Sequence, residues 1–423
     1  MTVWAVDGAA GCGKTYRLME TIAEAQRVAP LLSGQRILAL TYMRGSRLRL
    51  DSRLRESPDL RGRYSCVTID SFARRLRDRW RTLGRSLGLP DPEPEPVDFD
   101  AQCDLAGALL ERSAVREWIA ASFPIVLLDE AQDLAPERLR IFRALAEGVS
   151  LHIASDDFQC LNPALRPSPV AQWLPTVCTP ETVTKPQRTS VQGLLDAAWA
   201  IRGGGPPTNG PNFCIVPTPS VPLAAAWLAG AITHHNKGSV AVITPSHKGN
   251  FAQRVVTEVG SKPCGKNKHG PYVIRWENSD EAAAEALLET LVLPDPCSIP
   301  EAIMAIAALQ GHRGAVQQTI VWMRRQSNAL GRDTLDRKEI DAYIKRQVAN
   351  IRTRSGARAR LGAMTVHQAK NREFVGVVII WPFTVGGDDE AKRRLLYNAI
   401  TRAKQWCTVL VQSPDLLKNA PFA

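Results

Sequence analysis

Two short groups of residues carry the side chains most suited to chemistry. The first is Gly8-x-x-Gly11-x-Gly13-Lys14-Thr15, which follows a short β-type run and precedes a helical pattern. Glycines in this context let backbone N–H groups turn toward phosphate oxygens, and the start of the helix adds partial positive charge. We expect Lys14 to reach the β- and γ-phosphates of a nucleotide and the Thr15 hydroxyl to bind Mg²⁺. The spacing thus predicts a P-loop, with a chance glycine turn as the alternative.

The second group is the stretch IVLLDEAQD at residues 125–133. Its apolar run is typical of a strand buried on both faces of a parallel sheet, and ligands lie at the carboxyl ends of such strands. We expect Asp129 to hold Mg²⁺ through water and Glu130 to orient and deprotonate the attacking water. An acidic cap on the next helix is the alternative interpretation.

Length and composition favour a protein of two domains in a reducing compartment. The chain has 423 residues, too many for one ordinary core, and 44% of them are hydrophobic. No apolar run reaches the roughly 18–20 residues of a membrane span, and the start of the chain lacks a basic region and a cleavage site. Nine cysteines are scattered without a CxxC pair, which argues against disulfides and zinc. We therefore expect a cytoplasmic protein without a membrane partner.

The chain is basic, and its charge is unevenly distributed. The net charge is +11, and residues 311–362 hold twelve Arg and Lys against four Asp and Glu, a net +8. A second Arg-rich stretch lies at residues 44–55. Such runs favour a polyanionic partner. A solvated surface is the alternative, and for residues 311–362 a docking face for an acidic protein is another.

The stretch DEAQD at residues 129–133 resembles the second motif of superfamily 1 helicases, especially those of the UvrD/Rep type. A plain metabolic kinase does not need Gln132 and Asp133. In this family the residue at the position of Gln132 links the Mg²⁺ strand to the last motif, and we expect Asp133 to orient that network. Further stretches resemble family motifs in the family's order: ILALTYMRGSRLRLDSRL (37–54), VTIDSFARRL (67–76), LHIASDDFQCLNP (151–163), TKPQRTS (184–190), GAMTVHQAKNREFVGVVII (362–380) and RRLLYNAITRAKQWCTVLV (393–411).

The resemblance implies an α/β fold with two RecA-like P-loop NTPase domains, each a parallel sheet flanked by helices. We expect the first domain at residues 1–190, a linker at 191–212 and the second domain at 213–423. Family members carry large helical insertions in both domains, but here the insertions have room only at about 80–122 and about 275–360. We therefore expect small, mainly helical insertions, of which the second is basic.

The resemblance also assigns roles around ATP and Mg²⁺. Gln159 would sense the γ-phosphate and the attacking water beside Glu130, and Arg188 and Arg402 would stabilise charge on the γ-phosphate. Glu373 would bind the ribose and couple the site to the nucleic acid.

Four residues fall where family members contact single-stranded DNA. Tyr42 would stack on a base, with a core position as the alternative, and Arg44, Ser71 and His367 would contact the strand. The family usually has a His at the position of Asp70, and an acid beside a phosphate is unfavourable, so we expect no direct contact there.

Three further positions depart from the family pattern. Gln187 replaces the tyrosine that stacks on adenine, which predicts loose base selectivity. Asn371 replaces a glycine, and Asn tolerates left-handed backbone geometry, so we expect the turn to survive. The aromatic residues that follow Gln159 in relatives are missing, and Trp173 is a candidate substitute.

The leading hypothesis is an ATP-dependent helicase or translocase on single-stranded DNA, running 3′ to 5′ by resemblance and unwinding weakly on its own. RNA remains an open alternative as the substrate. A second hypothesis is a DNA-stimulated ATPase subunit that does not unwind, in a repair or anti-phage defence complex with a nuclease partner. A metabolic NTPase is a third.

Overall fold

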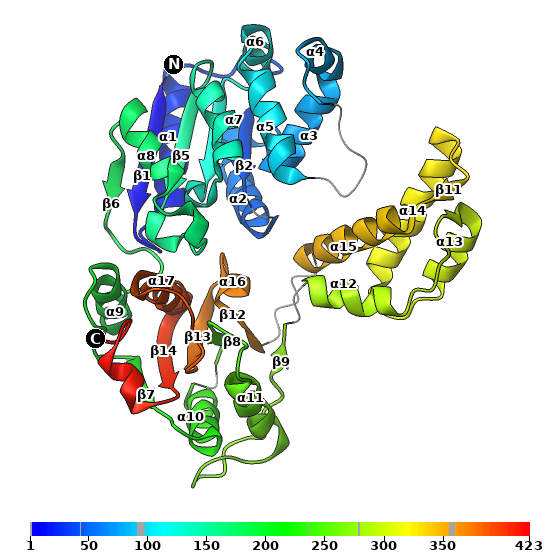
Figure 1. The fold of residues 1–423 in the computed structure, drawn as a ribbon. Helices are drawn as coiled ribbons and strands as arrows, with labels where there is room; N and C mark the ends of the chain where they lie inside the picture. Colours follow the sequence, from blue (N-terminus) through cyan, green and yellow to red (C-terminus); the bar gives the residue numbers. More distant parts are fainter. Residues whose placement is uncertain (1, 43, 91–97, 236, 278–279, 355–359) are drawn as a thin grey trace. The chain divides into compact units, whose positions relative to one another are not determined.

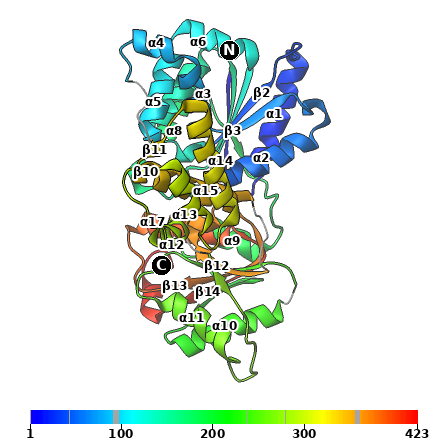
Figure 2. The same ribbon diagram turned by 90° about the vertical axis from the view of Figure 1, so that its right-hand side faces the viewer.

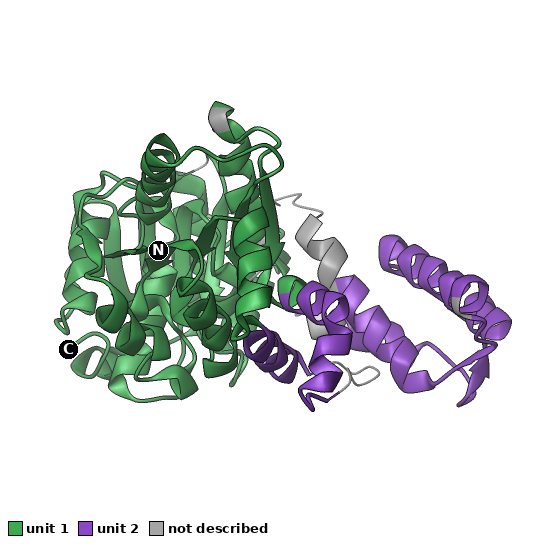
Figure 3. Ribbon diagram, turned by 90° about the horizontal axis from the view of Figure 1, so that it is seen from above, with its two compact units in different colours: residues 1–72, 110–277, 358–423 green, residues 73–109, 278–357 purple. Residues whose placement is uncertain are grey.

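The computed structural model describes residues 2–42, 44–90, 98–235, 237–277, 280–354 and 360–423 (Figure 1). The chain divides into two compact units (Figure 3). The first comprises Met1–Phe72, Leu110–Glu277 and Arg358–Ala423, and the second comprises Ala73–Leu109 and Asn278–Ala357. Within the described residues, no helix is both long and apolar enough to cross a membrane.

The first unit contains a six-stranded parallel sheet in the order β3-β2-β4-β5-β1-β6. Its strands are β1 (Val3–Gly8), β2 (Ile37–Thr41), β3 (Tyr64–Thr68), β4 (Ile125–Asp129), β5 (Ser150–Ser155) and β6 (Glu181–Val183). The helices that lie wholly in this part of the first unit are α1 (Lys14–Val28), α2 (Arg44–Glu56), α6 (Ser113–Ser122), α7 (Pro136–Ala146) and α8 (Pro169–Val177). The helix α3 (Ile69–Arg79) begins in the first unit and continues into the second.

The apolar runs of this sheet are covered by helices. Leu18 of α1 and Leu50 of α2 share one core with Ile37 and Leu127, so these two helices cover the same face, as Figure 2 also shows. The strands are parallel, and their carboxyl ends therefore lie at one edge of the sheet. The loop after β1 and the carboxylates at the end of β4 meet at this edge.

The same unit contains a second six-stranded parallel sheet, in the order β7-β14-β13-β8-β12-β9. Its strands are β7 (Phe213–Pro217), β8 (Val240–Thr244), β9 (Arg275–Trp276), β12 (Leu361–Thr365), β13 (Phe374–Trp381) and β14 (Ala403–Val411). The helices here are α9 (Gln192–Arg202), α10 (Val221–His234), α11 (Phe251–Ser261), α16 (Val366–Ala369) and α17 (Asp389–Ile400).

The strand β13 shows why this sheet is buried on both faces. Its Val377 and Ile379 lie in a core with residues of α9 and α17. Val378 and Ile380 lie in another core with residues of α10 and α11. Successive side chains of a strand point to opposite faces, so a continuous apolar run requires helices on both.

The range 191–212, expected to be a linker, contains the helix α9. Leu194, Ala197 and Ile201 of this helix are buried in the core of the second sheet. These residues recur at a spacing of three or four, which forms one apolar face of a helix. The helix therefore packs as part of the second α/β layer system.

The second unit has a core of its own, with Ile299, Met323 and Ile344 among its buried residues. Its elements are α4 (Arg81–Ser86), α5 (Phe99–Leu110), α12 (Asp280–Glu289), α13 (Ile299–Ala307), α14 (Arg313–Leu330), α15 (Arg337–Arg354) and the antiparallel pair β10 (Cys297–Ser298) and β11 (Thr334–Leu335). The unit is thus mainly helical.

The two parallel sheets of the first unit, each flanked by helices, confirm the prediction of an α/β fold with two RecA-like domains.

Candidate active site

The glycine loop that follows β1 requires glycine for two physical reasons. Gly11 and Gly13 have φ angles of +79° and +82°, a region that residues with a Cβ rarely adopt. A Cβ on Gly8 would lie 2.4 Å from the backbone oxygen of Val183 on the neighbouring strand β6. The loop is therefore both left-handed at two positions and closely packed at a third.

The segment expected to carry a γ-phosphate arginine packs directly on this loop. The backbone N–H groups of Gln187 and Arg188 donate to the Gly11 carbonyl at 2.7 and 3.1 Å. A Cβ on Gly11 would lie 2.8 Å from the Cβ of Arg188. The missing side chain thus allows the arginine to approach the loop.

Lys14 and Thr15 begin the helix α1, as a P-loop requires. The Lys14 ammonium donates to the Gly8 and Ala9 carbonyls at 2.7 and 3.1 Å. The Thr15 hydroxyl donates to Asp129 over 3.4 Å, so the two residues expected to hold Mg²⁺ are neighbours. A hydroxyl and a carboxylate are oxygen ligands of the kind that Mg²⁺ prefers.

Asp129 and Glu130 stand in different electrostatic environments. Burial and the neighbouring Glu130 charge raise the pKa of Asp129 to about 6. Burial would also raise the pKa of Glu130, but the charges of Lys370 and Lys14 outweigh it and hold that pKa below its usual range. Glu130 is therefore ionised and can accept a proton, and a bound cation would favour ionisation of Asp129.

Gln159 and Arg402 join the two sheets at this edge. Gln159 closes the 3₁₀ turn Asp157–Gln159 after β5, and its oxygen accepts a hydrogen bond from Arg402 at 3.2 Å. The guanidinium of Arg402 also donates to the Asn398 carbonyl at 2.9 Å. Burial and the charge of Arg188 lower the pKa of Arg402 to about 9.

Glu373 is held by cations from both parts of the first unit. Its carboxylate accepts from Arg188 at 2.9 Å and lies 2.9 Å from the Lys404 ammonium and 3.7 Å from the Arg49 guanidinium. Burial would raise the pKa of Glu373, but Arg188 and Lys404 bring it down to about 2. This carboxylate is therefore charged under all ordinary conditions.

The contacts of Gln132 differ from those that the resemblance implied. Its amide nitrogen donates to Glu130 at 2.5 Å, and its oxygen accepts from the backbone N–H of Asp156 at 3.0 Å. Both contacts lie within the first sheet, and the contact to a second-sheet motif is made by Asp133 instead. The Asp133 carboxylate lies 2.5 Å from the Lys370 ammonium.

These side chains surround a cavity of about 350 Å³. Ten of the residues predicted from the sequence line it: Gly11, Gly13, Lys14, Thr15, Asp129, Glu130, Gln159, Arg188, Glu373 and Arg402. Sequence reasoning did not assign three further cations to this cavity, although it noted the stretches that contain them: Arg49, Arg53 and Lys404. Arg49 and Arg53 are four apart on α2 and so share one helix face, which was a usable signal.

The donor set fits a nucleoside triphosphate with Mg²⁺. Six cationic side chains line the cavity against three carboxylates: Lys14, Arg49, Arg53, Arg188, Arg402 and Lys404 against Asp129, Glu130 and Glu373. Among the residues that the structure describes, no cluster of three or more His, Cys, Asp or Glu could hold a metal by itself. A site that shares its Mg²⁺ with substrate phosphates needs no such cluster.

Three of the residues expected to contact nucleic acid, Tyr42, Ser71 and His367, do not line this cavity. Tyr42 is 36% exposed, so it is not a core aromatic, and the Arg138 guanidinium lies 5.2 Å from its ring centroid. His367 is exposed, and the Ser71 hydroxyl accepts a hydrogen bond from Thr68 at 2.8 Å. The side chain of Arg44 lies outside the described residues.

The structure bears on three further positions. Asp70 pairs with Arg138 at 3.0 Å, which gives the acid a structural partner. Trp173 lies on the buried side of α8 and is only 7% exposed, so the expectation that it substitutes for the missing stacking residues is wrong. Asn371 has a φ of +65°, which confirms the left-handed turn predicted there.

The fold and the cavity define a P-loop NTPase with two RecA-like domains. Residues 1–163 match the family model of an AAA domain, and residues 361–410 match that of a UvrD-like helicase C-terminal domain. The segment at residues 361–410 is thus similar to the C-terminal domain of UvrD-like helicases, and residues 1–163 are similar to an AAA domain.

Among solved structures, the chain is similar to the crystal structure of Arterivirus nonstructural protein 10 (helicase). The identity is 12% and the TM-score 0.41, over 100% of this chain and 62% of that one. The complex of Arterivirus nonstructural protein 10 with DNA has a TM-score of 0.39 at 12% identity, over 100% and 63% of the two chains. This chain thus spans less than two thirds of the helicases it matches. A search of curated protein sequences found no match.

Proposed function

We propose that this protein is an ATP-dependent helicase or translocase that moves on single-stranded DNA. The observation that carries the proposal is the convergence of Lys14, Glu130 and Arg402 on one cavity. The first two follow strands of the first sheet, and the third begins the transition into β14 of the second sheet. A complete hydrolytic site therefore needs both sheets.

The side chains around the cavity have separate roles in ATP hydrolysis. Thr15 and Asp129 would hold Mg²⁺, which neutralises phosphate charge when it is bound. Glu130 accepts the proton of the attacking water, and Gln159 orients that water. Arg188 and Arg402 stabilise the charge that develops on the γ-phosphate.

The helix α2 connects this cavity to the proposed DNA contacts. Its Arg49 lines the cavity and donates to the Asn371 carbonyl, while Ser46 of the same helix accepts from the Asn371 amide at 2.6 Å. Tyr42 precedes this helix by two residues and is partly exposed. A movement of the two sheets during ATP turnover would therefore shift α2 and, with it, the proposed base-stacking residue Tyr42. The 3′ to 5′ direction is carried over from the family.

The test is steady-state ATP hydrolysis with and without single-stranded DNA, with single-stranded RNA in parallel. We expect DNA to stimulate turnover in the wild type and Glu130→Gln to abolish it. Short duplexes with a 3′ or a 5′ single-stranded tail then report strand separation and its direction. Turnover that is indifferent to every nucleic acid would overturn the proposal in favour of a metabolic NTPase.

A second candidate function is an ATPase subunit that unwinds only with a partner, such as a nuclease in repair or anti-phage defence. It is favoured by the small second unit and by the burial of Trp173, which removes a candidate base-stacking surface. DNA-stimulated turnover without any strand separation by the isolated protein would support this candidate.

Base selectivity is expected to be loose. Gln187 lines the cavity at the position where an adenine-stacking tyrosine is expected, and the aromatic Tyr16 that also lines it is 63% exposed. Competition of GTP and CTP against ATP in the same turnover assay measures this property. Strong preference for ATP would contradict it.

A further inference from the structure

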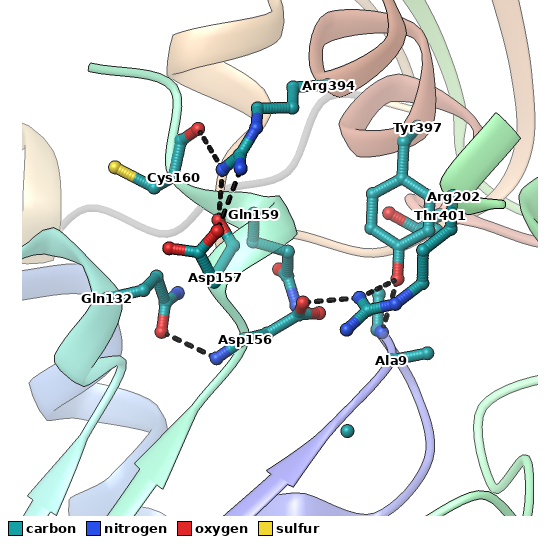
Figure 4. Close-up of polar contacts among 12 residues, drawn as sticks. Ala9, Gln132, Asp156, Asp157, Gln159, Cys160, Arg202, Arg394, Tyr397 and Thr401 are labelled. Carbon is teal, nitrogen blue, oxygen red and sulfur yellow. Dashed lines mark hydrogen bonds and ion pairs between the residues drawn. The ribbon is translucent and has the colours of Figure 1, made fainter. Parts of the chain in front are cut away.

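An arginine outside the sequence motifs pairs with a buried carboxylate that also pairs with Lys14. Arg202 is the last residue of α9, and its guanidinium donates to the carboxylate of Asp156 (Figure 4). The Asp156 side chain is fully buried, and that of Arg202 is 27% exposed. Asp156 directly follows β5 of the first sheet, whereas Arg202 ends a helix that packs on the second sheet.

The same carboxylate has a second cationic partner. The Lys14 ammonium lies 3.4 Å from the other Asp156 oxygen, which also accepts from the Gln159 amide at 2.7 Å. Burial would raise the pKa of Asp156, but Lys14 and Arg202 hold it below its usual range. A buried carboxylate that stays ionised must keep a cation beside it, because an unpaired buried charge is costly.

Arg202 also touches the glycine loop through a tyrosine. Its guanidinium lies 3.4 Å from the hydroxyl of Tyr397 (Figure 4). That hydroxyl accepts a hydrogen bond from the backbone N–H of Ala10 at 2.7 Å. The Tyr397 ring packs edge-on against Phe158 with centroids 5.0 Å apart. The arginine is therefore anchored to the loop that would hold the phosphates.

Lys14 and Arg202 thus share the buried carboxylate of Asp156, and Lys14 is also the residue expected to bind the nucleotide phosphates. Lys14 can turn to a phosphate only if Asp156 keeps a counter-charge after the ammonium leaves. Without Arg202, Lys14 would be held by Asp156, and nucleotide binding would have to break that pair.

We propose that Arg202 is a positioning residue that neutralises Asp156 and so releases Lys14 to bind the nucleotide. The inference rests on the proposed function, because it assumes that the cavity binds a nucleoside triphosphate. Arg202 itself need not touch the nucleotide.

The experiment is a binding titration of the full chain with ADP and with a non-hydrolysable ATP analogue, both with Mg²⁺, by calorimetry. The variants are Arg202→Gln, Arg202→Lys, Asp156→Asn and the double variant Arg202→Gln with Asp156→Asn. Asparagine keeps an oxygen that can accept from Gln159 but carries no charge. The exposed Arg254 of α11 provides the matched control Arg254→Gln.

We expect Arg202→Gln to weaken nucleotide binding by about tenfold, and Arg202→Lys to weaken it less. In the Asp156→Asn background the same change should cost less than about threefold, because no buried charge remains to hold Lys14. Arg254→Gln should bind like the wild type. Thermal unfolding monitored by circular dichroism shows whether each variant is folded. If Arg202→Gln is not folded, the double variant, which lacks both charges, is still compared with Asp156→Asn.

Two results would overturn the inference while leaving the proposed function intact. One is wild-type affinity in a folded Arg202→Gln variant. The other is an equal fall in affinity on Arg202→Gln whether Asp156 is present or replaced by asparagine, which would mean that the arginine acts on the nucleotide directly. A wild-type protein that binds neither nucleotide would instead overturn the proposed function and the inference with it.

Discussion

Arg402 donates a hydrogen bond to Gln159 at 3.2 Å, and both side chains are almost completely buried. Gln159 follows a strand of the first sheet, and Arg402 immediately precedes β14 of the second. A residue expected to orient the attacking water is thus in direct contact with one expected to stabilise the γ-phosphate. The geometry of the active site therefore depends on how the two sheets are placed relative to each other.

The first prediction concerns this contact. Arg402→Ala should reduce the turnover rate by about 10²- to 10³-fold, because it removes a preorganised donor for charge that develops in the transition state. The affinity for ADP should change much less, since ADP has no γ-phosphate. Stopped-flow turnover and ADP titration on the same preparation measure the two effects. Equal decreases in both would contradict the role in the transition state.

The second prediction concerns the turn at Asn371, which has a φ of +65°. Asn371→Val should lower the free energy of unfolding by about 1–2 kcal/mol, because a β-branched residue is strained in this conformation. Asn371→Gly relieves that strain, and both variants lose the side-chain hydrogen bond to Ser46, so the glycine variant should be the milder change. Urea unfolding measures both. A valine variant as stable as the glycine variant would argue against backbone strain.

The third prediction concerns pH and the buried His152 on β5. Its ring nitrogens lie 2.8 Å from the Thr21 hydroxyl and 3.1 Å from the Ser150 hydroxyl, and burial lowers its pKa to about 4. The unfolded chain takes up this proton below about pH 6.5, and the folded protein does so only near pH 4. The contribution of His152 to stability is therefore complete above pH 6.5 and is lost as the pH falls toward 4.

Replacement of this histidine isolates the effect. Between pH 7.5 and pH 5 the wild type should lose about 2 kcal/mol more of its free energy of unfolding than His152→Gln. Parallel urea titrations at the two pH values provide the measurement, and other titrating groups cancel in the comparison. Identical changes in the two proteins would show that His152 takes up its proton equally in both states.

The fourth prediction concerns the basic helices of the second unit. Arg324 and Arg325 are exposed on α14, whereas the side chains of Arg352 and Arg354 lie outside the described residues. If this surface binds single-stranded DNA, Arg324→Glu with Arg325→Glu should weaken binding. The salt dependence should also fall, by about 0.7 in slope for each phosphate that the variant no longer neutralises.

The matched control is Arg254→Glu on α11 of the first unit, which should leave the affinity for DNA close to that of the wild type. Fluorescence anisotropy across a salt series measures affinity and slope together. Unchanged affinity in the double variant would favour the alternative interpretation of the surface, a docking face for an acidic protein.

The local parts of the site could be predicted because their signals are local. The glycine loop from Gly8 to Gly13, the run into Asp129 and the substitution at Asn371 each depend on a few neighbouring residues. Backbone conformation and strand burial follow from such short patterns. The structure accordingly places Lys14, Thr15, Asp129 and Glu130 around one cavity.

Other features were decided only by tertiary packing. The sequence does not show that α9 packs on the second sheet, that Trp173 is buried, or that Gln132 contacts Asp156. Nor does it show that Arg202 meets Asp156, a contact between residues of two sheets. Sequence patterns report which faces are apolar and which turns are possible. Which polar groups then meet depends on how the two sheets pack together, because a buried charge is stabilised only by the partner that packing brings to it.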